Sequence, residues 1–338
     1  MNKLNLLTNG AVTALIRSWP LAIALLFFPG VAPAATLSWT TAATSVCTDG
    51  TGTTWSTAGA TSNHWMLVCG TGVPSAWTNG NDAIIGVGNG AAGTITLSGN
   101  PQVKNLTNFA AGSGDYTLTA SKLRITGTAA SPSIFYIDTG RNFNIGTSGT
   151  IAVQDATTLN TLQKEGAGVL HLRQTTGATN TYTGGTILNA GGLTIALSDN
   201  LGSGKFTINS GRFSSFNTTT VSITNSVDLG GNATIGHVSA SGAVSFNAAG
   251  TWTIKAATRT LTINSGATIN QVIGNDTSGA GLTKAGNSNL TLTAVSTYDG
   301  PTAISAGALT LGASAGLASG SSVNISAGAT FNVSAQAT

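Results

Sequence analysis

The sequence predicts an all-β solenoid, in which short strands stack coil upon coil and each coil buries its apolar residues against its neighbours. One observation is a pattern that occurs twice in the chain, 116 to 120 residues apart. Another is that nearly every apolar run beyond residue 35 is short, alternates with polar residues and ends at Gly, Asn or Ser, as in TITLSGN and DYTLTAS. Alternation with a period of two indicates half-buried strands, and internal repeats indicate stacked units.

The two copies of the pattern are matched almost residue by residue. The first copy runs LQKEGAGVLHL from Leu162 and TYTGGTILNAGGLTI from Thr181; the second runs LTKAGNSNLTL from Leu282 and TYDGPTAISAGALTL from Thr297. Alternation places the leucines of VLHL and NLTL on the inner face of their strands and His171 on the outer face. The residues that we take as the repeat signature are Lys164, Gly166, Gly168, Leu170, Leu172, Tyr182, Gly184, Gly185, Thr186 and Gly191, and in the second copy Lys284, Gly286, Leu290, Leu292, Tyr298, Gly300, Thr302 and Gly307.

A shorter element follows each copy and also occurs between them. It reads KFTINSG from Lys205, TLTINSG from Thr260 and SVNISAG from Ser322. Because side chains alternate between faces along a strand, Ile208 and Ile263 are predicted to point inward, with the Thr and Asn residues pointing outward. The glycine then turns the chain at low steric cost.

The composition agrees with a folded β chain of low charge. Glycine accounts for 45 of 338 residues, 41% of residues are apolar and only 7% are charged. Disordered chains are usually charged and poor in aliphatic residues, so this chain is expected to fold, and to do so without help from ion pairs. Removing Lys3 and Arg17 with the leader leaves 11 basic and 10 acidic residues, or +1. This charge gives no argument for binding nucleic acid or an acidic membrane surface.

Residues 1–35 are expected to be a signal peptide for Sec export. Positive residues precede the apolar run LAIALLFF, and Ala32-Pro33-Ala34 fits a cleavage site, with cleavage after Ala34 or Ala35. The alternative is a retained membrane anchor, but the apolar run is shorter than the 18 or so residues that a spanning helix needs. We therefore expect an exported protein at the cell surface or in the medium, and in the periplasm if it is not translocated.

Residues 36–80 are expected to form an N-terminal cap. Export favours a disulfide between Cys47 and Cys69, the two cysteines of the chain. Four of the six tryptophans gather in the same region: Trp39, Trp55, Trp65 and Trp77. They are interpreted as an apolar plug over the end of the solenoid or, alternatively, as an aromatic platform for a ligand.

Catalytic, cofactor and metal chemistry find little support in the sequence. His64, His171 and His237 lie far apart with no partner at ligand spacing, and Glu165 and the aspartates are scattered singly. Gly88 to Gly93 fits G-x-G-x-x-G, but a strand-like segment follows it instead of a helix. No catalytic residue, cofactor or metal ligand is therefore predicted, although carboxylates from different coils could meet in the fold. A carbohydrate-active β-helix enzyme, of polysaccharide lyase or hydrolase type, stays open as an alternative.

The two copies resemble the autotransporter-associated β-strand repeat, whose pattern is approximately L-x-K-x-G-x-G-x-L-x-L, then N-T-Y-T-G-G-T, then I-x-x-G-x-L. The second copy departs from it at Asp299 and Pro301, where an altered turn is expected. The resemblance implies a right-handed, single-stranded parallel β-helix over residues 81–338. It also implies a non-enzymatic passenger with a structural or adhesive role at the surface of a Gram-negative bacterium. The partner would be a glycan or a protein, and contact with the membrane would run only through a translocator.

Two expectations about this passenger remain open at the level of sequence. The chain stops at FNVSAQAT, inside a repeat, so we expect either a truncated gene or another delivery route. A secreted carbohydrate-binding module centred on the cysteine pair is a further alternative, which would require exposed tryptophan rings.

Overall fold

The structure is a computed structural model of the chain. It describes residues 34–40, 53–57, 64–67, 74–88, 91–109, 114–146, 152–174, 179–239, 241–247 and 249–336. The chain divides into two units, 1–33 and 34–338, and everything below concerns the second. Cys47, Cys69 and all but the last two residues of the expected signal peptide lie outside the described residues. The disulfide and the leader therefore stay predictions.

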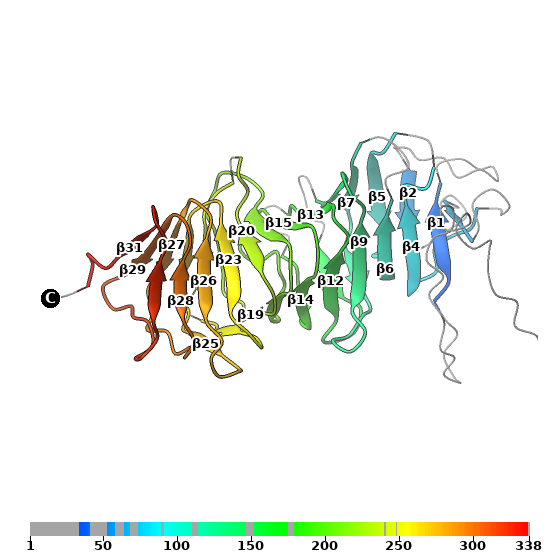
Figure 1. The fold of residues 1–338 in the computed structure, drawn as a ribbon. Helices are drawn as coiled ribbons and strands as arrows, with labels where there is room; N and C mark the ends of the chain where they lie inside the picture. Colours follow the sequence, from blue (N-terminus) through cyan, green and yellow to red (C-terminus); the bar gives the residue numbers. More distant parts are fainter. Residues whose placement is uncertain are drawn as a thin grey trace, which may run out of the picture. The chain divides into compact units, whose positions relative to one another are not determined.

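The described residues form strands that belong to three sheets (Figure 1). The first sheet contains β1 (Thr36–Trp39), β3 (Trp65–Met66), β4 (Asn81–Ile85), β6 (Gln102–Asn108), β8 (Leu123–Ile125), β9 (Ser133–Ile137), β11 (Val153–Asp155), β12 (Thr161–Glu165), β14 (Gly185–Leu188), β16 (Phe206–Ile208), β19 (Val227–Leu229), β22 (Trp252–Ile254) and β25 (Ile273–Asn275). The second sheet contains β2 (Thr53–Ser56), β5 (Thr94–Ser98), β7 (Tyr116–Ala120), β10 (Asn142–Ile145), β13 (Val169–Leu172), β15 (Gly192–Ile195), β17 (Arg212–Ser215), β20 (Ala233–Ile235), β23 (Arg259–Ile263), β26 (Leu282–Ala285), β28 (Thr302–Ile304) and β30 (Val323–Ile325). The third sheet contains β18 (Val221–Ile223), β21 (Val244–Phe246), β24 (Ala267–Ile269), β27 (Asn289–Leu292), β29 (Ala308–Leu311) and β31 (Thr330–Asn332).

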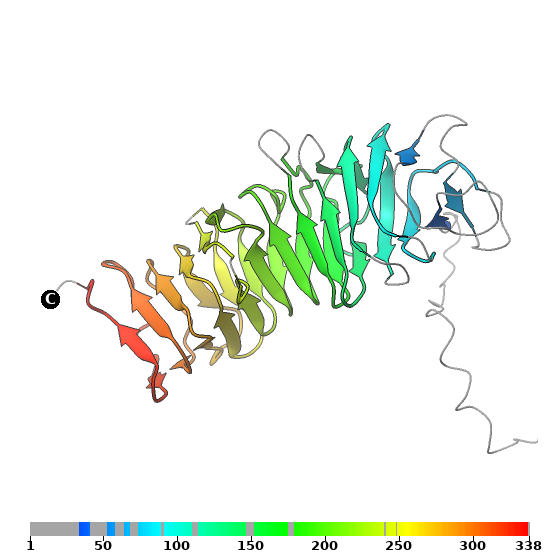
Figure 2. The same cartoon turned by 90° about the horizontal axis from the view of Figure 1, so that it is seen from above.

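Successive coils pair in parallel, which confirms the predicted parallel β-solenoid. Thr186 of β14 lies opposite Phe206 of β16, 20 residues later, and Asp228 of β19 lies opposite Thr253 of β22, 25 residues later. Among the paired strands described, only β1 and β3 are antiparallel. Figure 2 shows the strands of successive coils side by side in chain order. None of the described residues belongs to a helix long and apolar enough to cross a membrane.

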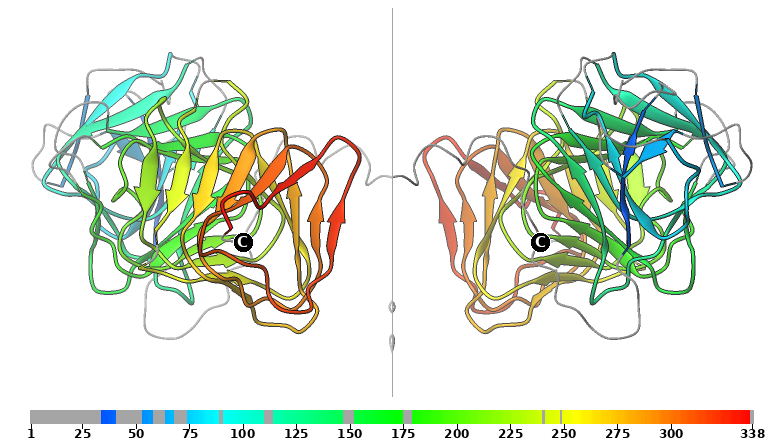
Figure 3. Two further views of the ribbon diagram at one scale, coloured as in Figure 1. Left: turned by 90° about the vertical axis from the view of Figure 1, so that its left-hand side faces the viewer. Right: turned by 90° about the vertical axis from the view of Figure 1, so that its right-hand side faces the viewer.

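The sheets surround the interior of the solenoid (Figure 3). The buried core residues stack there from coil to coil at equivalent positions. One such row in the second sheet runs Ile95, Leu118, Ile145, Leu172 and Ile195. Each of these side chains is fully buried. Burial of this kind contributes about 2 kcal/mol per aliphatic side chain, and each coil depends on its neighbours for it.

The set of sheets changes along the chain. Up to β17 the coils alternate mainly between the first and second sheets; from β18 to β25 each coil visits all three; from β26 onward the coils alternate between the second and third. The first change coincides with a polar residue in the inward row, because Ser215 lies opposite Ile195. The Ser215 hydroxyl donates to the carbonyl of Thr219, 2.8 Å away, just before β18 begins.

The tryptophans of the N-terminal region form a buried cluster. Trp39, Trp55, Trp65 and Trp77 are at most 4% exposed, and the Trp55 and Trp65 rings meet edge to face with centroids 4.7 Å apart. Such contacts add about 0.5–1.5 kcal/mol each to the burial itself. The rings therefore match the apolar plug and not a platform that faces solvent.

The outer faces carry polar ladders, as the alternation in the KFTINSG and TLTINSG segments predicts. Ile208 and Ile263 are fully buried, whereas the Asn209 amide donates to Asn189 Oδ1 at 2.8 Å and the Asn189 amide donates to Glu165 Oε1 at 2.6 Å. Each of these bonds joins one coil to the next.

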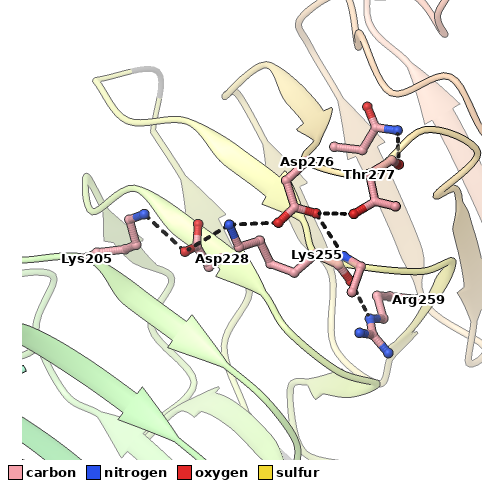
Figure 4. A network of polar contacts seen from close by, with 8 residues as sticks. Lys205, Asp228, Lys255, Arg259, Asp276 and Thr277 are labelled. Carbon is pink, nitrogen blue, oxygen red and sulfur yellow. Dashed lines mark hydrogen bonds and ion pairs between the residues drawn. The ribbon is translucent and has the colours of Figure 1, made fainter. Parts of the chain in front are cut away.

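Ion pairs do occur on the outside of the first sheet, although the sequence predicts a fold that needs no help from them. Charges alternate there over four coils, in the order Lys205, Asp228, Lys255 and Asp276 (Figure 4). The nitrogen-to-oxygen distances are 3.0, 3.8 and 3.0 Å. A low total charge does not prevent pairing, because stacking of the coils brings residues 21 to 27 positions apart in sequence next to one another.

Candidate functional site

The signature lysine of each repeat copy occupies an inward position. Lys164 lies between Phe135 and Leu188 in an otherwise apolar row, and Lys284 lies between Leu261 and Ile304 in the equivalent row of the second sheet. Both lysine side chains are fully buried. A lone buried ammonium is costly unless hydrogen bonds satisfy it, so its partners decide what it does.

The partners of both ammonium groups are backbone carbonyls at the corners of the coils. Lys164 Nζ donates to the carbonyls of Glu165 (2.6 Å), Gly166 (2.8 Å) and Ala190 (3.2 Å). The first two belong to the corner of its own coil and the third to the corner of the next coil. All three protons of the ammonium are used, and the lysine ties two successive corners together.

Lys284 repeats this arrangement in the second copy. Its Nζ donates to the carbonyls of Gly286 (2.6 Å) and Ala306 (2.8 Å), the counterparts of Gly166 and Ala190, and also to the carbonyl of Ser288. Burial lowers the pKa of Lys164 to about 7, against the opposing effect of the Glu165 carboxylate, and lowers the pKa of Lys284 to about 8. In both copies, therefore, a buried lysine links the backbone of two successive corners by hydrogen bonds.

The signature glycine after each corner makes room for this network. A Cβ at Gly191 would lie 2.4 Å from the carbonyl oxygen of Gly166, and a Cβ at Gly307 would lie 2.6 Å from Lys284 Nζ. Both glycines also have positive φ angles, of 66° and 64°. Both the positive φ angle and the lack of space for a Cβ therefore require glycine at these two positions.

The tyrosine and threonine of the signature form a buried pair in each copy. Tyr182 Oη and Thr186 Oγ1 are 2.6 Å apart, as are Tyr298 Oη and Thr302 Oγ1. Burial raises the pKa of both tyrosines, so each phenol stays protonated and can donate. Gly184 and Gly300 allow the neighbouring backbone to approach closely, since a Cβ on either would lie within 2.4 Å of it.

The remaining signature residues also serve the scaffold. Leu170, Leu172, Leu290 and Leu292 point into the core as predicted. Gly168 contacts the backbone of Asp138, leaving no space for a Cβ. The structure thus brings the signature together as a corner that stabilises the fold, with every ammonium proton already bonded.

A different group of residues forms an open pocket of about 260 Å³ on the outside of the second sheet. It lies over β10, β13, β15 and β17, beside the turn that follows β20. Its lining consists of Asn142, Val169, His171, Thr194, Arg212, Ser214, Ser215, Phe216, His237, Ser239 and Ser241.

The Phe216 ring contacts both a cation and a second ring beside this pocket. The Arg173 guanidinium carbon lies 3.9 Å from the centroid of the Phe216 ring, and the His171 ring meets Phe216 edge to face at 5.1 Å. His171 Nδ1 is 2.5 Å from Thr194 Oγ1. Burial lowers the pKa of His171 to about 4, and repulsion from Arg173 acts in the same direction, so His171 is neutral at pH 7.

Sequence reasoning placed His171 on an outer face but missed the pocket. It treated His171 and His237 as isolated, whereas the fold brings both to the same lining. The available signal was the change from Thr291 in NLTL to His171 in VLHL, a departure from the polar ladder at one outward position. Arg212 and Phe216 gave no such signal, because their placement depends on the register between coils. No group of residues that could hold a metal ion occurs within the described ranges.

Comparison with known proteins identifies the repeat. The Passenger-associated-transport-repeat model matches residues 162–195 and 282–311, which are the two copies described above. No match was found among curated proteins, and none among solved structures. The chain is thus a parallel β-solenoid that carries two passenger-associated transport repeats, consistent with an autotransporter passenger.

Proposed function

We propose that the chain is an exported, non-enzymatic passenger that acts as a structural or adhesive element at the surface of a Gram-negative bacterium. The observation that carries this proposal is the pair of passenger-associated transport repeats within a parallel β-solenoid. A solenoid presents long rows of outward residues on a stacked core, an arrangement suited to contact with an extended partner.

The chemistry of the repeat supports a scaffold in preference to an enzyme. Each signature lysine donates to three carbonyls, and each signature tyrosine is buried against a threonine. The Ala256 amide and, after it, Lys255 lower the pKa of Asp276, and Lys255 also pairs with Asp228. An acid–base pair for glycoside cleavage would require a carboxyl with a raised pKa and a second carboxylate facing it. Burial raises the pKa of Asp82, but the groups that act on this carboxyl are Asn105, which donates to it at 2.9 Å, and Lys104, and not a second carboxylate.

Expression of the full chain with its own leader in a Gram-negative host tests this proposal. We expect a processed product in the exported fractions and increased adherence of the cells to host or abiotic surfaces. An unprocessed product confined to the cytoplasm would contradict export. Release of reducing ends or unsaturated sugars from polysaccharides by the purified protein would contradict the non-enzymatic role and favour the carbohydrate-active alternative.

A further inference from the structure

The pocket on the second sheet is shaped by a glycine that makes room for an arginine. Val169, Gly192 and Arg212 lie opposite one another in successive strands, at outward positions. A Cβ on Gly192 would lie 3.0 Å from both Val169 methyl groups and 3.2 Å from Arg212 Nη2. The guanidinium of Arg212 thus lies across the position that a larger residue at 192 would fill. In the second copy the equivalent residue is Ala308.

The charge of this pocket is positive and unbalanced. Arg212 Nε is buried and has no hydrogen-bond partner. Arg173 Nη1 reaches Asn144 Oδ1 at 3.3 Å, a neutral acceptor. No aspartate or glutamate is among the lining residues. The carboxylate that acts on His171 is Asp115, which accepts hydrogen bonds at 2.9 Å from the backbone and side-chain nitrogens of Asn142.

The rest of the lining is rich in hydroxyl groups beside a small apolar wall. Thr194, Ser214, Ser239 and Ser241 supply hydroxyls. Phe216 and Val169 supply the apolar surface. The volume of about 260 Å³ is just below the range of about 300–1,000 Å³ usual for small-molecule sites, which suits one ring and not a longer chain.

We propose that this pocket binds one acidic sugar unit of a surface glycan, with Arg212 receiving its carboxylate or sulfate group. The assignment rests on the proposed adhesive function and names its ligand class. A guanidinium binds a carboxylate or a sulfate group through two parallel hydrogen bonds, and the guanidinium of Arg212, which lines the pocket, has no hydrogen bond or ion pair to another described residue. The hydroxyls of the lining then pair with those of the sugar ring, and Phe216 covers its apolar face.

Binding to the purified mature chain tests the assignment by titration calorimetry with four probes. They are methyl β-glucuronide, methyl β-glucoside, glucose 6-sulfate and inorganic phosphate. We expect the glucuronide or the sulfated sugar to bind at least tenfold more tightly than the neutral glucoside, with affinity falling as salt is added. The preferred acidic probe identifies which oxyanion the site takes. Phosphate binding as tightly as the better acidic sugar would mean a general anion site and would overturn the saccharide assignment.

Variants locate the binding. Arg212→Gln should weaken the preferred acidic probe at least tenfold, whereas Lys122→Gln, which removes one positive charge from an exposed side chain outside the pocket, should change it less than twofold. Gly192→Ala keeps the arginine but displaces its guanidinium, so it should weaken binding severalfold even if Arg212→Gln proves unstable. Unchanged affinity in both pocket variants overturns the proposal.

Failure of this assignment is distinguishable from failure of the proposed function. Cells that display the chain and adhere equally well with wild type and Arg212→Gln would remove this pocket from adhesion but leave the passenger role intact. A chain that is not exported would contradict the passenger role, while the calorimetry on purified protein would still report on the pocket.

Discussion

The two repeat copies build the same corner on different pairs of sheets. In the first copy the strand with the lysine, β12, belongs to the first sheet and the next strand, β13, to the second. In the second copy the corresponding strands, β26 and β27, belong to the second and third sheets. The lysine, the glycines and the tyrosine–threonine pair are nevertheless arranged alike. The repeat therefore specifies a corner between two adjacent sheets, and not a particular side of the solenoid.

Each copy also lies where a row of strands ends. The amide of Thr181 donates to the carbonyl of Val153 in β11, the last strand of its branch, at 2.9 Å. The amide of Thr297 donates to the carbonyl of Ile273 in β25, the last strand of the first sheet, at 2.7 Å. In both cases the next residue is the buried signature tyrosine. The tyrosine thus fills the core on the side where a loop replaces a strand.

The turns of the two copies exchange the roles of donor and acceptor. Thr183 donates from its hydroxyl to Asp155 of the preceding coil, at 2.6 Å. Asp299, at the equivalent position, accepts from Ser278 and Gly279 of the preceding coil, at 2.7 and 2.9 Å. The link between coils is kept although the carboxylate has moved from one partner to the other.

The outward positions differ most between the copies. In the second copy Asn289 joins two threonines in a polar ladder: its amide nitrogen donates to Thr291 Oγ1 and its amide oxygen accepts from Thr310 Oγ1, both at 2.9 Å. In the first copy the equivalents of Thr291 and Ala308 are His171 and Gly192, which belong to the pocket or shape it. The inward residues keep the scaffold constant, and the outward residues are free to differ.

The largest loss of stability is expected when a core leucine is changed, and making this change in both copies tests whether their cores are equivalent. Leu172→Asp and Leu292→Asp each bury a carboxylate in an aliphatic row with no partner, so each should lower the free energy of unfolding by at least about 4 kcal/mol. Thermal melting followed by circular dichroism measures the loss, with His171→Asn as an outward control. A mild effect in one copy only would show that its core is not packed like the other.

Exchanging glycine and proline at the equivalent positions 185 and 301 is expected to destabilise the first copy much more than the second. Gly185 has a φ angle of 111°, which proline cannot adopt, so Gly185→Pro should cost about 3 kcal/mol or more. The reverse change, Pro301→Gly, should cost only about 0.5–1 kcal/mol, because it mainly increases the freedom of the unfolded chain. Urea unfolding of both variants checks this, and similar losses in the two would argue against a different turn in the second copy.

The fold could be predicted from the sequence because apolar and polar residues alternate along the chain in the same way as inward and outward positions alternate along each strand. Leu170 and Leu172 alternate with His171 in the sequence, and the same alternation separates core from surface in the structure. The altered turn at Pro301 was also readable, since proline cannot take the backbone of Gly185. Local rules were enough in both cases.

The lysine corners are expected to matter somewhat less than the core leucines. Lys164→Met removes the donor of three partly buried carbonyls. It also removes the cost of burying the ammonium, so the net loss in the free energy of unfolding should be about 2–3 kcal/mol. Lys284→Met should cost a similar amount, since two of its three acceptors are equivalent. Chemical denaturation measures both, with Lys122→Met as the exposed control. A stabilising effect of either change would mean that the ammonium does not hold the corner.

The role of these lysines and the pocket could not be predicted from sequence alone. A lysine within an alternating strand reads as a surface residue, and only the neighbouring coil supplies the Ala190 carbonyl that makes its burial tolerable. The pocket likewise combines His171, Arg212 and His237, which become neighbours only through stacking. Contacts between coils depend on loop lengths, which local patterns do not fix.

A pH dependence should distinguish the outward faces of the two copies. The folded pKa of His171, about 4, lies below its unfolded value of about 6.5, so the unfolded state binds more protons between these limits. The free energy of unfolding should therefore fall as the pH drops from about 6.5 to 4, with His171 accounting for about 1–3 kcal/mol of this fall. His171→Thr, which copies the residue of the second repeat, should remove this share. Urea titrations at pH 7 and 4.5 on both proteins measure it, and identical pH profiles would contradict burial of the imidazole.

The smallest expected effect concerns the coils that separate the copies. Lys255 is bonded to both Asp228 and Asp276, and these contacts raise its pKa, but its side chain is 35% exposed. Exposed pairs contribute less than about 1 kcal/mol and weaken in salt, so Lys255→Gln should lower the free energy of unfolding by no more than that, and the difference should vanish in 1 M salt. Melting curves at low and high salt measure this, with Lys122→Gln as the unpaired reference. A loss as large as that at Lys164, insensitive to salt, would mean that charge pairing holds the three-sheet coils in register. The change from one pair of sheets to the next between the copies would then depend on the surface row as well as on the core.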